Sequence, residues 1–126
     1  KVSLNARPKS IHFKSLQNKE SDFYMLGWGV PTLDSHYVFS YLAATEGSWN
    51  FTGFSDARLD ELTKAMEVET DMAKRDAMIA EAWEILKASN VYLPLHHQVI
   101  AWGMAEGLDL PIVPNDSPSF RMAQMK

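Results

Sequence analysis

The stretch DFYMLGWGVPTLDSHYVFSYL, residues 22–42, contains the two patterns that decide the fold class. Residues 22–28 form an apolar run of strand length, which predicts a buried strand. The next four residues, from Gly29 to Thr32, interrupt that run. Asp34 or Ser35 can then cap a short helix. Its expected apolar residues are Tyr37, Val38, Tyr41 and Leu42. A strand followed by a capped helix predicts a chain that mixes α and β structure.

Helices are also expected on both sides of this stretch. Pro8 suits the first turn of a helix that ends at about Gln17. After a loop over residues 45–54, Ser55 is expected to cap a helix whose apolar face is Leu59, Leu62 and Met66. A longer helix is expected over residues 70–89, with one face formed by Met72, Ile79, Trp83 and Leu86.

Further strands are expected near both ends of the chain. Residues 2–6 alternate apolar and polar side chains, and residues 91–95, 99–102 and 108–113 are strand-like runs. Pro94 makes the first of these three an edge strand or bends it. Strands mixed with helices of unequal length predict an α/β or α+β fold, without the regular alternation of a doubly wound domain.

Composition excludes several classes of function. The chain has 126 residues, of which 46% are hydrophobic, so one domain with a real core is expected. Its net charge is -4 and it has no basic stripe, so no nucleic-acid partner is expected. It has no cysteine, which excludes thiol chemistry and disulfides.

The sequence carries no motif for catalysis or for a cofactor. It has no glycine-rich phosphate loop, no Gly-x-Ser-x-Gly elbow and no paired-histidine helix motif. His96 and His97 would point to opposite faces of a strand, so no metal site is expected there. A hydrolase that pairs either histidine with Asp34 lacks a nucleophile motif, and His36 is expected to be structural. We expect no enzyme, no cofactor and no metal.

Aromatic side chains are the best candidates for a binding surface. They lie in or beside predicted loops and strand ends, where binding residues are common: Trp28, Trp49, Phe51, Phe54 and Trp102. Core packing explains any one of them equally well. Trp83 has core spacing on its helix and is expected to be buried.

Five short motifs in order carry a resemblance to a known family. They are Asp22-Phe23-Tyr24 with Gly27-Trp28-Gly29 and Asp34, residues 50–55 (NFTGFS), residues 59–62 (LDEL), Asp71 with Lys74-Arg75 and Glu81-Ala82, and residues 92–96 (YLPLH). From about Ser21 to Trp102, the chain resembles the C-terminal part of the family 5 extracellular solute-binding proteins. These are periplasmic receptors that serve ABC importers.

The resemblance implies a two-lobed fold of the type II periplasmic binding proteins, closing over a ligand. Residues 1–107 would be the latter half of the C-terminal lobe, with the hinge strand. Residues 108–126 would be a returning tail that packs on the first lobe. The parent protein would be exported, several times longer than this chain, and would deliver its solute to a membrane permease. The absence of a first methionine and of a signal peptide fits this expectation.

In the family, the tryptophan that matches Trp28 lines the ligand cavity, so Trp28 is the first candidate for ligand binding. Its expected neighbours in the site are Gly29, Val30, Pro31, Thr32 and Asp34. The glycines on both sides of Trp28 would let backbone come close. Weaker candidates are Trp49, Asn50, Phe51 and His96.

Pro31 departs from the pattern of the peptide receptors. Many of them have an aspartate here that pairs with the amino terminus of the ligand, and proline cannot replace it. The Trp-Gly-x-Pro pattern is closer to receptors for nickel complexes or other solutes, yet residues 43–50 contain no histidine to contact a metal. We therefore expect a peptide or similar small solute, with a nickel complex, another non-peptide solute or a stand-alone interaction domain as alternatives. Exposed lobe faces should make the isolated chain self-associate.

Overall fold

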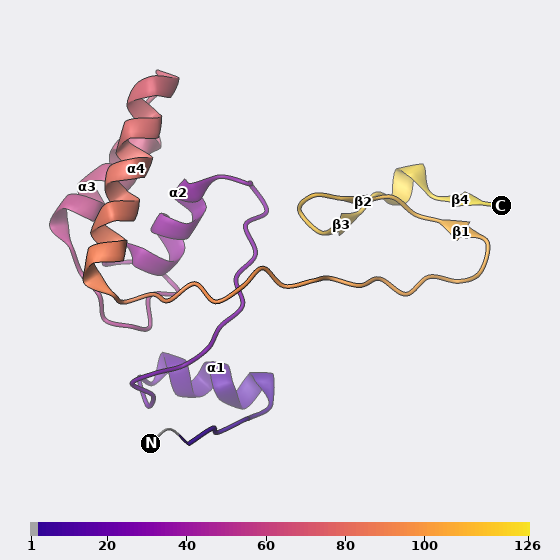
Figure 1. Cartoon of the computed structure of the whole chain (residues 1–126), viewed down its shortest axis with the longest axis horizontal. Coiled ribbons are helices and arrows are strands. Elements are labelled where there is room, and N and C mark those ends of the chain that lie inside the picture. Colours follow the sequence, from indigo (N-terminus) through magenta and orange to yellow (C-terminus); the bar gives the residue numbers. More distant parts are fainter. Residues whose placement is uncertain (1–2) are drawn as a thin grey trace.

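The computed structural model describes residues 3–126 and shows a helical body followed by a long extended segment and small hairpins (Figure 1). Helices account for 40% of the chain and strands for 6%, so the mixed α and β class is confirmed. The helices are α1 (Lys9–Gln17), α2 (Ser35–Val38), the π-helix η1 (Phe39–Ala43), α3 (Ala57–Met66) and α4 (Met72–Ser89). No helix within residues 3–126 is long and apolar enough to cross a membrane.

Aspartates begin the helices of the body. Asp34, Asp56 and Asp71 each accept a hydrogen bond from a backbone N–H in the first turn of α2, α3 and α4. The expectation that Ser55 caps α3 is wrong. The Asp56 carboxylate accepts from Leu59 N at 2.8 Å, whereas Ser55 Oγ bonds Thr45 Oγ1 at 2.9 Å.

The core lies where α3, α4 and η1 meet. Its buried side chains are Phe39, Ala43, Leu59, Leu62, Met66, Ala82 and Leu86. The predicted apolar face of α3 is therefore confirmed. On α4 the prediction is wrong for Met72, which is the first residue of the helix, is 80% exposed and is not part of the core. The prediction that Trp83 is buried is also wrong, because its side chain is 40% exposed. It packs against Phe39 with ring centroids 4.9 Å apart, and its indole N–H donates to the hydroxyl of Ser35.

Four predicted strands are not formed. The described part of residues 2–6 has no regular structure, and Val2 lies outside the described residues. Residues 22–28, 91–95 and 99–102 are extended but belong to neither sheet. A strand needs a partner for its backbone N–H and C=O groups, and no described segment pairs with these three in a ladder. Residues 22–28 are also not buried as expected, since Phe23 is 84% exposed.

The C-terminal residues form two small antiparallel pairs. β1 (Leu108–Asp109) pairs with β4 (Gln124–Met125), and β2 (Ile112–Val113) pairs with β3 (Ser117–Pro118). The single strand expected over residues 108–113 is interrupted before Ile112, because Pro111 has no N–H to donate. The short 3-10 helix η2 (Phe120–Met122) joins β3 to β4.

Two side chains tie this C-terminal part to the rest of the chain. Asn115 Nδ2 donates to Pro31 O at 3.4 Å, and Trp102 Nε1 donates to Asp116 Oδ1 at 2.6 Å. The extended segment that leads to the hairpins passes close to the one that follows α1 (Figure 1). A methyl group on Gly27 would lie 3.9 Å from Gln98 Oε1. The two extended segments are thus neighbours at that point.

Candidate ligand-binding site

Six aromatic side chains from five parts of the chain form one connected group, called here the aromatic cluster. Its members are Phe13, Trp28, Tyr37, Tyr41, Trp49 and Phe51. Trp28 is central, with ring centroids 5.6 Å from Trp49, 5.9 Å from Tyr37 and 6.2 Å from Tyr41. These are the separations of favourable tilted and edge-to-face pairs. The structure therefore brings Trp28, Trp49 and Phe51, three predicted site residues, together.

The helix that follows Asp34 presents the two tyrosines. Tyr37 and Tyr41 are four residues apart and lie on one face, with ring centroids 4.5 Å apart. The π-helical turn closes with a bond from Ala44 N to Phe39 O at 2.8 Å. Trp49 N then donates to Tyr41 O at 2.9 Å, which fixes the loop that carries Trp49 against η1. The sequence identified this helix but gave no reason to place its tyrosines in the site.

Trp28 has an unusual polar feature. The side chain is partly buried, and its Nε1 is buried without an acceptor among the described residues. A buried N–H that gives up water without a replacement costs about 1–3 kcal/mol. Buried polar groups without a partner are rare and often mark a functional site. The indole N–H thus lacks an acceptor in the described structure, and a ligand or another part of the protein would have to reach this buried atom to supply one.

The residues after Trp28 form a turn rather than a wall of the cluster. Leu33 N donates to Val30 O at 3.0 Å, and both Pro31 and Thr32 are exposed. A Cβ on Gly29 would meet no atom within 4 Å. In the described structure the space beside this glycine is therefore open.

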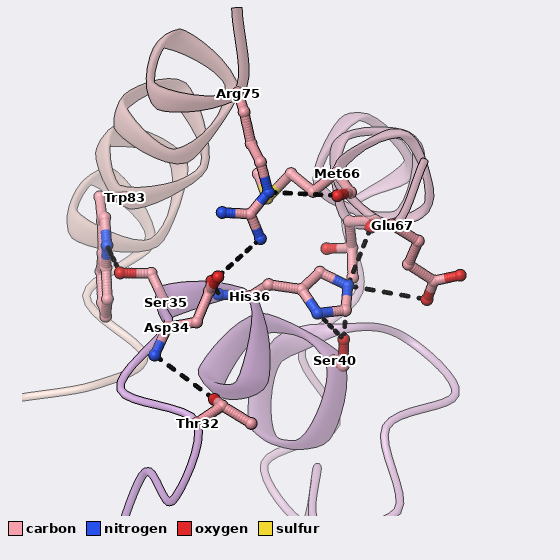
Figure 2. Close-up of polar contacts among 10 residues, drawn as sticks. Thr32, Asp34, Ser35, His36, Ser40, Met66, Glu67, Arg75 and Trp83 are labelled. Atoms are coloured by element: carbon pink, nitrogen blue, oxygen red, sulfur yellow. Dashed lines mark hydrogen bonds and ion pairs between the residues drawn. The ribbon is translucent and has the colours of Figure 1, made fainter. Parts of the chain in front are cut away.

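Asp34 is held by the protein itself, as Figure 2 shows. Its Oδ1 accepts from His36 N at 2.8 Å, and its Oδ2 lies 2.8 Å from Arg75 Nη2. Arg75 also donates to Met66 O at 3.3 Å, so it joins the start of α2 to the end of α3. The hydrogen bond from Arg75 is the main reason that the pKa of Asp34 is lowered. Motif spacing drew attention to Arg75 but not to this contact.

The His36 ring contacts other groups of the chain, as expected for a histidine with a structural role. Its Nε2 lies 3.1 Å from Thr63 O, 3.0 Å from Ser40 Oγ and 3.6 Å from Glu67 Oε1 (Figure 2). In a Ser-His-acid triad, serine and acid contact opposite ring nitrogens. Here both lie nearest to the same nitrogen, so the group lacks the geometry of a catalytic relay.

Two of the weaker candidates, Asn50 and His96, are not part of the aromatic cluster. Asn50 uses its amide internally, donating to Ala44 O at 3.0 Å and to Phe54 O at 2.8 Å, which shapes the loop. His96 is exposed on the extended segment and is not part of the aromatic cluster. Within residues 3–126, no group of three or more His, Cys, Asp or Glu side chains could hold a metal ion.

No family model matches the chain, and neither does any curated protein or solved structure. The candidate site therefore stands on the residues and contacts described above.

Proposed function

We propose that this chain is part of a non-enzymatic solute-binding protein, which captures a peptide or similar small solute and delivers it to an ABC-type importer. The parent protein would be exported to the periplasm and would have two lobes. The aromatic cluster is the observation that carries the proposal, because it combines apolar rings with a buried polar donor, the indole N–H of Trp28, that has no acceptor among the described residues. Ligand sites commonly combine mostly apolar walls with a few polar groups that orient the ligand.

The extended segments support the two-lobed part of the proposal. Large apolar side chains on residues 22–28 and 93–104 are exposed: Phe23, Met25, Leu93, Leu95, Val99, Ile100, Trp102 and Met104. Contiguous exposed apolar surface marks an interaction site in a stable protein. Strands from a first lobe would cover these side chains and pair with the backbone beside them.

One observation favours a solute without a free amino group next to Trp28. Pro31 carries no charge, and its carbonyl accepts from Asn115. The nearby carboxylate of Asp34 is already paired with Arg75 and with the start of α2. A protonated amine would find no free carboxylate at these two positions. This favours a non-peptide solute, or a peptide whose amino terminus lies elsewhere.

The size and compartment of the parent protein are the first test. An antibody raised against these 126 residues is used on fractionated source cells. We expect a band several times larger than 14.3 kDa in the periplasmic fraction. A cytoplasmic band near 14.3 kDa would contradict the proposal and would favour a stand-alone interaction domain.

The second test measures solute affinity in the parent protein by calorimetry. Trp28→Ala should weaken binding about tenfold or more, as truncation of an aromatic anchor does. Trp83→Ala is the matched control, because Trp83 contacts Phe39 and Ser35 and lies outside the aromatic cluster. Equal losses of affinity in the two variants, at equal folded fraction, would contradict the assignment of Trp28.

A further inference from the structure

A concave surface lies between the start of α1 and the segment that follows it. The chain reverses after α1, so that residues 25–27 run back alongside the helix (Figure 1). The two parts border a shallow, open cavity of about 350 Å³. Arg7, Lys9, His12 and Phe13 line one side, and residues 25–27 line the other. Of the described lining residues, Gly27 belongs to a motif considered above, whereas Arg7, Lys9 and His12 do not.

The cationic side chains of the cavity are held in place. Arg7 Nη1 donates to the buried Ser15 Oγ at 2.9 Å. The Lys9 ammonium lies 5.4 Å from the centre of the Phe13 ring, within the range of a cation–π contact. His12 Nε2 lies 3.1 Å from Met25 O, and a carbonyl only accepts, so this nitrogen carries the proton.

Positive charge is concentrated here although the chain as a whole is acidic. Two permanent cations line the cavity, and none of the described lining residues is an acid. Glu20 feels the charge of Arg7, but its lowered pKa comes first from the hydrogen bond with Asn18, and Glu20 does not line the cavity. None of the acids that give the chain its net charge of -4 lines the cavity, although Glu20 lies close enough to Arg7 to feel its charge.

The remaining lining is apolar. Phe13, Met25 and Leu26 contribute a ring and two aliphatic side chains beside the cations. Phe13 also packs against Trp49 with ring centroids 5.4 Å apart, so the cavity adjoins the aromatic cluster. A ligand that matches both features has an anionic head and a small apolar body. Charge-assisted hydrogen bonds from Arg and Lys to carboxylate or phosphate oxygens are the strong contacts available for such a head.

We propose that this cavity is a binding site for an oxyanion, a carboxylate or a phosphate, carried on a small apolar group. The proposal does not depend on the receptor function. It concerns Arg7, α1 and residues 25–27, of which Phe13 also belongs to the aromatic cluster, and it holds or fails whether or not Trp28 binds a solute.

The experiment is a titration of the isotopically labelled 126-residue chain, followed by the backbone amide resonances. The probes are phenylacetate and phenyl phosphate, with benzylamine as a cationic probe of similar size and acetate as an anion without a ring. We expect saturable shifts at residues 9–13 and 25–27 with the two aromatic anions, weaker ones with acetate, and none there with benzylamine. The helical shifts of α1 in the same spectra report that the helical side of the cavity is formed. The stronger of the two anions identifies the preferred head group.

Two lysine variants give the decisive comparison. Lys9→Gln removes a cation from the cavity, and Lys14→Gln removes one from the same helix outside the lining. Lys9→Gln should weaken binding about two- to fivefold, the range for one exposed charge contact, and Lys14→Gln should not. Equal weakening in the two variants, an equal response to benzylamine, or no saturable shift at these residues would each overturn the proposal.

Discussion

Arg75 is the residue that joins three helices of the body. Its guanidinium contacts Asp34 before α2 and Met66 O at the end of α3, and its own backbone belongs to α4. Arg75→Ala removes one ion pair and one hydrogen bond that are partly shielded from water. We expect the free energy of unfolding to fall by about 1–2 kcal/mol, measured by urea denaturation.

Arg58 provides the matched control. Arg58 pairs with Glu81 at 2.7 Å, but both side chains are about half exposed. Water and salt screen such pairs strongly, so Arg58→Ala should cost clearly less than Arg75→Ala. A larger loss of unfolding free energy in Arg58→Ala than in Arg75→Ala would contradict this account.

The ion pair of Asp34 also makes stability depend on pH. The pKa of Asp34 is lowered below its ordinary value of 3.8, chiefly by the hydrogen bond from Arg75. The unfolded chain therefore takes up the proton at a higher pH than the folded chain. The stabilisation is complete above pH 3.8 and is lost as the pH falls through the folded pKa. Asp34→Asn should flatten this acid limb in denaturation curves. An acid limb equally steep in the variant and in the unsubstituted chain would contradict this account.

Substitution by alanine should destabilise the protein at Gly47 but have almost no effect at Gly29. A Cβ on Gly47 would lie 2.7 Å from Tyr41 O and 2.9 Å from Ala44 O, both backbone atoms that cannot swing away. Gly47→Ala should therefore cost about 1–3 kcal/mol in thermal or urea unfolding. At Gly29 a Cβ meets nothing within 4 Å, so Gly29→Ala should stay within about 0.5 kcal/mol. Similar losses at both positions would contradict this account.

At the level of elements, the capping aspartate of α3 is open to a direct test. Asp56→Ala should lower the free energy of unfolding by about 1 kcal/mol, because Leu59 N loses its acceptor. Ser55→Ala should cost less, since that hydroxyl bonds only the exposed Thr45 hydroxyl. A larger loss of unfolding free energy in Ser55→Ala than in Asp56→Ala, measured by urea denaturation, would indicate that Ser55 is the cap.

The helices and the strands differ in how far the sequence predicts them. Pro8, Asp34 and Asp71 mark helix starts through local backbone chemistry, and the spacing of Leu59, Leu62 and Met66 marks the buried face of α3. Such signals lie within the element itself. The apolar run 22–28 also reads as a strand, but a strand forms only with a partner that may lie far away in the chain. No described segment supplies one.

The candidate site is likewise only partly readable from sequence. Trp28, Trp49 and Phe51 are identified by aromatic type and position next to chain breaks. Tyr37 and Tyr41 join them because a helix turns that face toward Trp28. The role of Asp34 depends on Arg75, which is forty-one positions away in the sequence, and no local pattern predicts that contact.

For the molecule as a whole, exposed apolar side chains predict self-association of the isolated chain. Val99 is 90% exposed in a segment whose backbone belongs to neither sheet. Unpaired extended segments of this kind readily add a strand from another chain. We expect concentration-dependent oligomers in sedimentation velocity, reduced by Val99→Lys.

Val68→Lys is the control, because Val68 is 79% exposed but lies in the turn after α3. It should leave the oligomers unchanged. A chain that stays monomeric at high concentration, or one that both substitutions affect equally, would contradict an interface along the extended segment.

Tyr92 marks the point where the chain leaves the folded core and enters the exposed extended segment. Its hydroxyl donates to Leu42 O at 2.5 Å and its ring packs at the edge of the core, whereas residues 93–100 are all exposed. If the C-terminus were pulled in an optical trap, the short hairpins and the contacts with Pro31 and Asp116 would yield first and lengthen the molecule at low force. Resistance would rise only when the load reached Tyr92, where further extension has to break the core.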